Sequence, residues 1–176
     1  MKNIIAFAGS NSKISINKQL ALYASSLVEG VNVTVLDLND YHLPLFGVDL
    51  EKEKGIPDDA YKFLDILKNT DGIILSLAEH NGAYSAVFKN LFDWLTRIDG
   101  KMFFSKPMLL MATSTGGRGG LTALGIAQGR FPFHDGNIIE SFSLPFFGNN
   151  FLDGKITNED FDGQLKNAVQ QFEKAL

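Results

Sequence analysis

Three serines and two asparagines follow the first apolar run of the chain. The run Ile4–Ala8 stops at Gly9, and the stretch GSNSKISIN then leads into a helical pattern. Backbone N–H groups at a helix N-terminus favour an anion, and side-chain hydroxyls and amides add further donors. Neither G-x-G-x-x-G nor the Walker A pattern occurs, so one terminal phosphate fits better than a pyrophosphate or triphosphate. Plain N-capping by a single residue is the competing explanation. The candidate phosphate residues are Ser10, Ser12, Ser15 and Asn17.

Two further loops follow apolar runs. Glu79, His80, Asn81 and Gly82 come after the run Gly72–Ala78, and their backbone N–H groups and amide suit a flat heterocycle with many acceptors. The segment Ser114–Gly120 (STGGRGG) is dense in glycine, which lets the backbone lie close against a ligand. For each loop a plainer alternative stays open. His80 is then a surface residue, the glycines form an ordinary hinge, and Arg118 faces solvent instead of a second, phosphate-bearing ligand.

No acid, base or nucleophile signature accompanies these loops. The chain has no cysteine, no G-x-S-x-G elbow and no H-E-x-x-H, and its three histidines are not at metal-ligand spacing. Asp93 and Arg97 are four residues apart, which predicts an ion pair on a helix. We therefore predict neither a metal nor a catalytic side chain. A cofactor that carries its own chemistry, such as a flavin, explains this absence.

Alternating apolar and amphipathic segments must position the three loops. Mostly non-alternating apolar runs predict strands buried on both faces of a parallel sheet. The strand candidates are Ile4–Ala8, Val31–Leu38, Gly72–Ala78, Met108–Thr113 and Ile138–Leu144. Helices are expected at 16–29, 57–69, 85–98, 119–129 and 159–174. Strict alternation predicts one α/β domain over residues 1–176, a flavodoxin-like three-layer sandwich with strand order 2-1-3-4-5. Ligands of such sheets bind beyond the carboxyl ends of the strands, where the strand order reverses.

Composition excludes several function classes. The chain has 176 residues and a net charge of −4 without any basic block, so nucleic-acid binding is not expected. The five apolar residues after Lys2 are too few for a signal peptide or a membrane span. The absence of cysteine fits a reducing compartment, and we expect a cytoplasmic protein.

The loops together resemble the NADPH-dependent FMN reductase family of flavodoxin-like NAD(P)H:flavin and quinone oxidoreductases. The family pattern G-S-x-R-x-x-S-x-N is similar to residues 9–17, and its L-P-L-F segment to Leu43–Phe46. Its P-E-Y-N followed by L-K-N-x-x-D-W-x-[ST]-R resembles residues 78–81 and 88–97. Its K-P strand and S-x-G-x-x-G-G loop resemble Lys106–Pro107 and residues 114–120. The chain departs from these patterns at Ser12 (Arg), Ala78 (Pro), His80 (Tyr), Ala83 (Ser) and Ser85-Ala86 (Pro-Gly).

The resemblance implies a bound FMN, with NADPH or NADH as the electron donor. Family members pass electrons to quinones, azo compounds, flavins or similar small acceptors in a ping-pong cycle. They form dimers or dimers of dimers through helices beside the flavin, and Phe92 and Trp94 are candidates for that surface, although a core role for Trp94 is equally compatible with its spacing. An FMN-binding electron carrier and a fold relative without flavin are the alternatives. The implied cofactor-binding residues are Ser10, Ser12, Ser15, Ile16, Asn17, Glu79, His80, Asn81, Gly82, Ser114, Thr115, Gly116 and Gly117.

Overall fold

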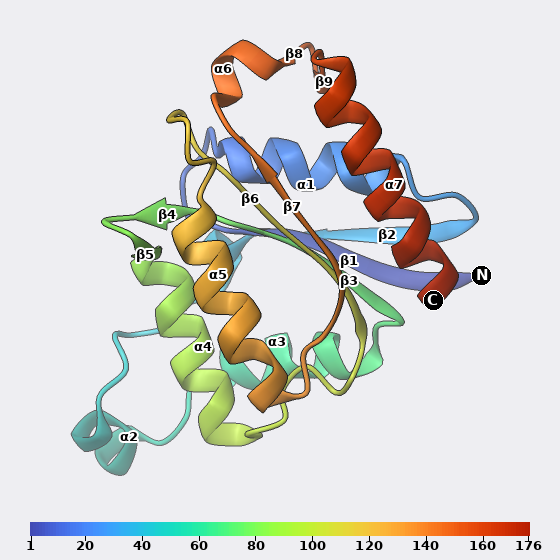
Figure 1. The fold of residues 1–176 in the computed structure, drawn as a ribbon. Helices are drawn as coiled ribbons and strands as arrows, with labels where there is room; N and C mark the ends of the chain where they lie inside the picture. The colour runs from blue at the N-terminus through green and yellow to red at the C-terminus, as the bar shows by residue number, and fades with distance from the viewer.

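Five parallel strands form the central sheet of the computed structural model, which describes residues 1–176 (Figure 1). The sheet order is β2-β1-β3-β6-β7, which confirms the predicted order 2-1-3-4-5 and the flavodoxin-like fold. The direction of the strand order reverses between β1 and β3, and this reversal defines the point where ligands bind. The strands are β1 (Lys2–Gly9), β2 (Val31–Leu36), β3 (Gly72–Leu77), β6 (Pro107–Thr113) and β7 (Asn137–Leu144).

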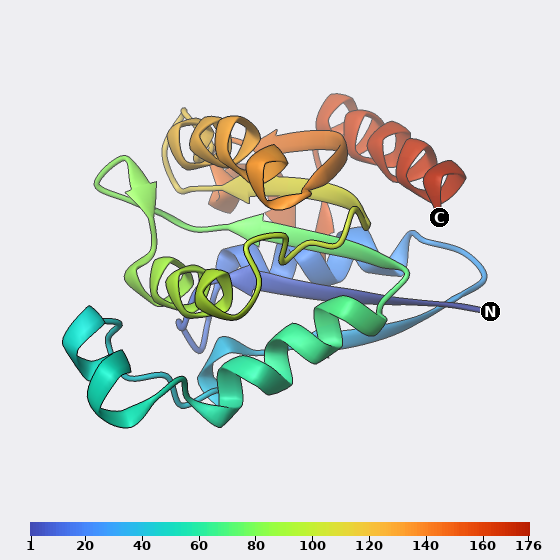
Figure 2. The same ribbon diagram turned by 90° about the horizontal axis from the view of Figure 1, so that it is seen from below.

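Helices cover both faces of this sheet. Figure 2 shows helices in front of the strands and behind them, so that they form two layers. Every predicted helix is present, with ends shifted by up to three residues. The first layer contains α1 (Ile16–Ser26) and α7 (Glu159–Ala175), and the second contains α3 (Asp58–Asn69), α4 (Ala86–Ile98) and α5 (Leu121–Arg130).

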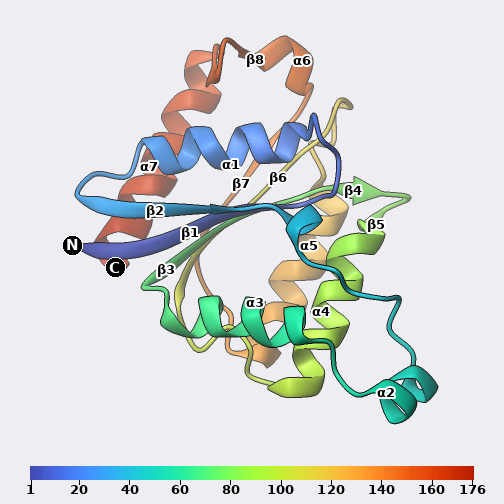
Figure 3. The ribbon, with the colours of Figure 1, turned by 180° about the vertical axis from the view of Figure 1, so that it is seen from behind.

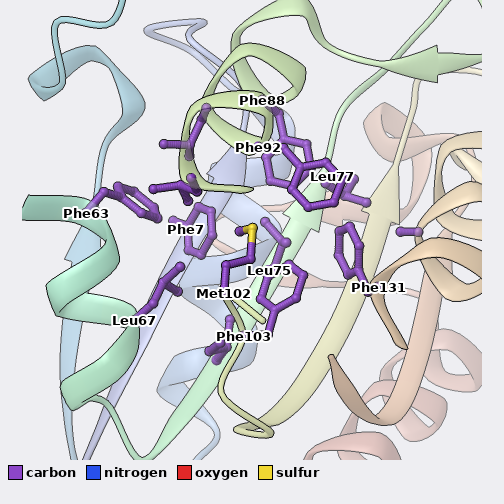
Figure 4. Close-up of a cluster of buried hydrophobic side chains, with 14 of the residues drawn as sticks. Phe7, Phe63, Leu67, Leu75, Leu77, Phe88, Phe92, Met102, Phe103 and Phe131 are labelled. Atoms are coloured by element: carbon purple, nitrogen blue, oxygen red, sulfur yellow. The ribbon is translucent and has the colours of Figure 1, made fainter. Parts of the chain in front are cut away.

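Alternating side chains of the inner strands divide the apolar core in two. In β1, Ile5 and Phe7 point into a cluster of 24 buried residues under α3, α4 and α5, many of them aromatic (Figure 4). Ile4 and Ala6 point the other way, into a cluster of 18 buried residues under α1 and α7. Because successive residues of a strand face opposite sides, burial on both faces explains the continuous apolar runs of the sequence.

Several short elements were not predicted. They lie in the connections, and α2 projects away from the body of the molecule (Figure 3). These elements are η1 (Leu38–Asp40), α2 (Val48–Lys54), the hairpin β4 (Glu79–His80) and β5 (Ala83–Tyr84), η2 (Phe131–His134), α6 (Phe147–Asn150), and the hairpin β8 (Phe151–Leu152) and β9 (Lys155–Ile156).

Two side-chain predictions on α4 are wrong. Asp93 pairs with Lys89, one turn earlier, at 2.6 Å. Arg97 instead reaches Glu51 of α2 at 2.9 Å, so it secures the projecting helix. Phe92 belongs to the buried core and not, as the second of these predictions stated, to an outer face. For Trp94, which has no exposed surface, the alternative of a core role is confirmed.

The motif residues Asn90 and Trp94 hold the segment after β2. The Asn90 side chain accepts from the Phe46 N–H at 2.8 Å and donates to the carbonyls of Leu43 and Pro44. Trp94 Nε1 donates to the Pro44 carbonyl at 2.7 Å. The segments 43–46 and 88–97, which resemble the family, therefore hold each other in place.

None of the helices combines the length and the apolar character needed to cross a membrane.

Candidate functional site

A cleft of about 410 Å³ opens at the carboxyl ends of β1, β3 and β6. All three loops predicted from the sequence contribute to it, which agrees with the strand-order argument. Asn81, Gly82, Gly116 and Gly117 were predicted for the site but lie outside its lining. Ile14, Ala78 and Thr113 line it and were not predicted. The lining residues are Ser10, Ser12, Ile14, Ser15, Ile16, Asn17, Ala78, Glu79, His80, Thr113, Ser114 and Thr115.

Volume alone does not identify this cleft as the site. A second cleft of the same volume lies between β7 and α7, lined by residues such as Glu140, Ser141 and Gln164. It touches none of the three loops and is away from the reversal of strand order. The loop composition and the topology therefore single out the first cleft.

The first loop presents donors without internal partners. Ser15 is the N-cap of α1, and its Oγ accepts from the Lys18 N–H at 3.1 Å. Ser10 Oγ likewise accepts from the Ser12 N–H at 3.2 Å. Both hydroxyl oxygens act as acceptors, so both O–H groups remain free to donate to a ligand. The N–H groups of Ile16 and Asn17 lie in the first turn and have no intrahelical partner. Ser15 therefore caps α1, as the plainer explanation predicted, and still leaves an O–H group that could bind an anion.

The side chain of Asn17 has a different role from the one predicted. It is 3% exposed, and its Oδ1 accepts from Ser76 Oγ at 2.7 Å and from the Thr113 N–H at 3.0 Å. Its Nδ2 donates to the Thr113 carbonyl at 3.1 Å. The amide therefore fixes the start of α1 to β3 and β6. What Asn17 offers to the cleft from this position is its backbone N–H.

Positive charge beside the first loop is limited. Lys18 forms an ion pair with Asp37 at 2.6 Å, and hydrogen bonds from Lys18 and then from the Asn39 N–H hold the pKa of Asp37 below its ordinary value. Lys13 is exposed and makes no ion pair. The position of the family arginine is Ser12, also exposed. Lys13 is thus the cation of this loop that is not already paired.

The second loop is a tight hairpin rather than an open loop. Asn81 and Gly82 have φ values of 52° and 70° and form the two-residue turn between β4 and β5. Positive φ at both central positions is what Asn-Gly hairpin turns require. These two residues therefore shape the turn and lie outside the cleft lining, whereas His80 lies exposed in the cleft wall.

Glu79 links this hairpin to the next helix. One carboxylate oxygen, Oε2, accepts from the N–H groups of Thr122 and Ala123 at 2.9 and 3.0 Å. Those N–H groups lie in the first turn of α5, so Glu79 supplies the cap that Gly120 cannot. Glu79 lines the cleft, and its carboxylate secures α5.

The third loop is tied to the end of β7. The Gly116 carbonyl accepts from Ser114 Oγ at 3.2 Å and from the Phe146 N–H at 3.0 Å. A Cβ on Gly119 would collide with Ser143 and the backbone at Pro145, so the loop requires glycine there. Arg118 is exposed and donates to Thr122 Oγ1 at 3.2 Å, outside the cleft lining.

The donor set fits a phosphate monoester and no metal. No group of three His, Asp or Glu side chains is arranged to hold a metal ion. Serine hydroxyls, helix N–H groups and one unpaired lysine are the groups that bind a terminal phosphate. The fold and this cleft define a flavodoxin-like protein with a cleft rich in hydrogen-bond donors at the reversal of its strand order.

Comparison with known proteins specifies the family. The sequence pattern of a family described as NADPH-dependent FMN reductase matches residues 2–145. The chain therefore belongs to the NADPH-dependent FMN reductase family, whose description names FMN and NADPH. This membership confirms the resemblance read from the loops.

Three individual proteins that resemble this chain are each 30% identical to it or less. A quinone reductase of Escherichia coli K12 is 30% identical over 78 residues, 44% of this chain and 42% of that protein. An NADPH azoreductase of Bacillus sp. OY1-2 is 29% identical over 121 residues, 69% of this chain and 64% of that protein. The flavoenzyme NAD(P)H:(acceptor) oxidoreductase FerB from Paracoccus denitrificans superposes with a TM-score of 0.77 at 25% identity, covering 99% of this chain and 97% of that one.

Proposed function

We propose that this protein binds FMN in the cleft and uses it to carry electrons from NADPH or NADH to a small acceptor. The observation that carries the proposal is the convergence of the serine-rich loop, the β4–β5 hairpin and the glycine loop on one cleft. FMN when bound supplies the hydride and electron chemistry. A quinone reductase, an azoreductase and an NAD(P)H:(acceptor) oxidoreductase among the similar proteins support acceptors of these kinds. We propose the ping-pong cycle that the family resemblance implies.

The side chains of the cleft would bind and orient the cofactor. Free O–H groups of Ser10 and Ser15, with the N–H groups of Ile16 and Asn17, would hold the phosphate. Ser12 and Lys13 lie at the exposed side of the same loop. The wall at Glu79 and His80 would face the ring from one side, and the segment 114–117 from the other. Because these groups only bind and orient, the proposal requires no catalytic acid or base from the cleft.

We also infer a cytoplasmic homodimer or dimer of dimers. Absence of cysteine fits a reducing compartment. Three exposed apolar side chains lie on α5 and on η2, the short helix that follows it. They are Leu121, Ile126 and Phe133. Their exposure supports this layer as the contact between subunits, and light scattering coupled to size-exclusion chromatography measures the oligomeric state.

The first test is retention and reduction of the flavin. FMN is added to the purified protein, the excess is removed, and the visible spectrum is recorded before and after NADPH in the absence of oxygen. Retained flavin that is bleached supports the reductase. Retained flavin that stays oxidised points to a carrier reduced by another donor, and failure to retain flavin contradicts the proposal.

A second test adds the arginine that the family pattern carries at position 12. We expect Ser12→Arg to tighten FMN binding several-fold, because an arginine-to-phosphate hydrogen bond is charge-assisted and stronger than a neutral one. Ser12→Gln is the matched control, since it has a long polar side chain without charge. Fluorescence titration measures both dissociation constants in low and high salt. Equal affinities for the two variants would show that the phosphate does not lie at this loop.

A further inference from the structure

Phe146 has a backbone conformation that bulky residues rarely adopt. It follows β7 with φ 46° and ψ 56°, in the left-handed region. For a bulky residue this conformation is an outlier, and such strain persists only where surrounding contacts enforce it. The Phe146 side chain is nevertheless 51% exposed, so its own burial does not explain the strain.

Contacts on both sides of Phe146 enforce the conformation. Its N–H donates to the Gly116 carbonyl, and the next N–H, of Phe147, donates to the Ser114 carbonyl, both at 3.0 Å. The Phe147 ring is buried and stacks on Phe151 with the ring centroids 4.6 Å apart. Phe147 thus anchors the segment inward, and Phe146 is directed outward at the edge of the third loop.

The Phe146 ring lies directly on this glycine loop. A Cβ placed on Gly117 would be 2.7 Å from Cζ of Phe146, so glycine at 117 makes room for the ring. The same loop begins with Ser114 and Thr115, which line the cleft. One side of the ring therefore contacts the loop, and half of the residue remains open to solvent. The next residue, Phe147, is bonded to Ser114 of the cleft lining, which places Phe146 near the cleft.

We propose that Phe146 is a specificity-determining residue that packs against the flat ring of the electron acceptor at the mouth of the cleft. The inference rests on the proposed function and names the acceptor as aromatic or quinonoid. A protein partner is less well supported, because the following residues Gly148 and Asn149 are exposed and offer no apolar surface. An offset or edge-to-face contact with an aromatic ring favours flat acceptors over compact inorganic ones.

The test separates ring contact from apolar bulk. Phe146→Leu keeps an apolar side chain over Gly117 but removes the aromatic face, and Phe146→Tyr keeps that face. With FMN loaded and NADPH saturating, we expect Phe146→Leu to raise KM for menadione three- to tenfold, while Phe146→Tyr stays near the wild type. KM for ferricyanide, which has no ring, should not change in either variant. Leu152→Ala, an exposed apolar residue of β8, is the control for surface effects.

A binding measurement complements the kinetics. Calorimetric titration of the FMN-loaded protein with 2-naphthol, a flat ring that accepts no electrons, should show a similar three- to tenfold loss of affinity in Phe146→Leu. Phe146→Gly should melt at or above the temperature of Phe146→Ala, because glycine relieves the positive φ. Unchanged menadione KM and naphthol affinity in Phe146→Leu would overturn the inference while leaving the proposed function intact. Failure of the wild type to retain or reduce FMN would overturn both.

Discussion

At the scale of single residues, the Tyr84 hydroxyl is buried without a hydrogen-bond partner. The Tyr84 ring packs edge to face on Phe88 at 5.3 Å within the aromatic cluster. Burial, opposed by the charge of Arg130, raises the pKa of Tyr84 to about 12. An unpaired buried hydroxyl costs about 1–3 kcal/mol, so Tyr84 contributes less stability than its ring alone would.

We therefore expect Tyr84→Phe to stabilise the protein at neutral pH by about 1 kcal/mol, or roughly 2–4 °C in melting temperature. Alkaline behaviour should change as well. The folded pKa lies above the unfolded value of about 10, so the neutral phenol favours the folded state below pH 10 and loses this effect as pH rises toward 12. Thermal melts of both proteins from pH 7 to 11 check this. A lower melting temperature for Tyr84→Phe at pH 7 would show that the hydroxyl has a partner, for example in a second subunit.

Sequence reasoning located residues better than it assigned their roles. Ser10 and Ser15 were expected to donate to a ligand, and their O–H groups are free in the structure. Asn17 was expected to do the same, yet its amide bonds to Ser76 and Thr113. From the sequence alone, serine and asparagine near the start of a helix are equally good candidates for binding a ligand. The structure shows the difference, because β3 and β6 lie beneath α1 and the Asn17 side chain bonds to them instead of to a ligand.

At the scale of elements, Glu79 couples the β4–β5 hairpin to the start of α5. Loss of a helix cap costs about 0.5–2 kcal/mol, and here the hairpin position would be lost with it. We expect Glu79→Ala to lower the melting temperature and weaken FMN binding, because the walls on either side of the cleft are no longer held together. Glu79→Gln keeps an acceptor oxygen and should restore much of both properties.

Circular-dichroism melts and FMN titrations of the two variants give the comparison. Ser114→Ala serves as a control on the other wall, since it leaves the Glu79 bond in place. If Glu79→Gln proves as weak as Glu79→Ala, the negative charge rather than the hydrogen bond holds the helix. If neither variant affects FMN binding, the hairpin does not need this link.

The main elements could be predicted because burial on both faces leaves a simple pattern. The inner strands β1, β3 and β6 are apolar and buried over most of their length, and helices such as α4 show a regular apolar face. The β4–β5 hairpin was missed because strands of two residues are too short to show periodicity. Its Asn81-Gly82 pair is nevertheless a strong short hairpin signal. Arg97 and Glu51 are more than forty residues apart in the sequence, so the spacing of residues within one helix could not predict their ion pair.

At the scale of the whole molecule, the outer strand β2 leaves one edge of the sheet without protection against pairing. The outer strand β2 (VNVTVL) contains no charged residue, proline or glycine, and four of its six residues are exposed. Val33 and Val35 share the α1 face with Ile4 and Ala6, their partners on β1. Natural edge strands usually carry a charge or another device against pairing with a second chain. This edge lacks one.

We expect Val33→Lys to reduce aggregation on heating while changing the melting temperature little, because exposed substitutions usually change stability by about 0.5 kcal/mol or less. Gln170→Lys on α7 adds one positive charge away from this edge and serves as the control. Light scattering during a thermal ramp at several protein concentrations provides the measurement. The edge is not the aggregating surface if the two variants scatter alike.

The second core cluster joins the two ends of the chain, with Ile4 and Ala6 of β1 packed in the same cluster as Leu165, Val169 and Phe172 of α7. On a translating ribosome, β1 emerges before α7, so that face cannot be fully covered until α7 has been made. At about 5–20 residues per second, the interval is on the order of ten seconds or more. During this time one face of the nascent sheet stays exposed, although α1 can already cover part of it. The protein's yield in a cell therefore depends on translation speed and on chaperones that bind the exposed face of the growing chain.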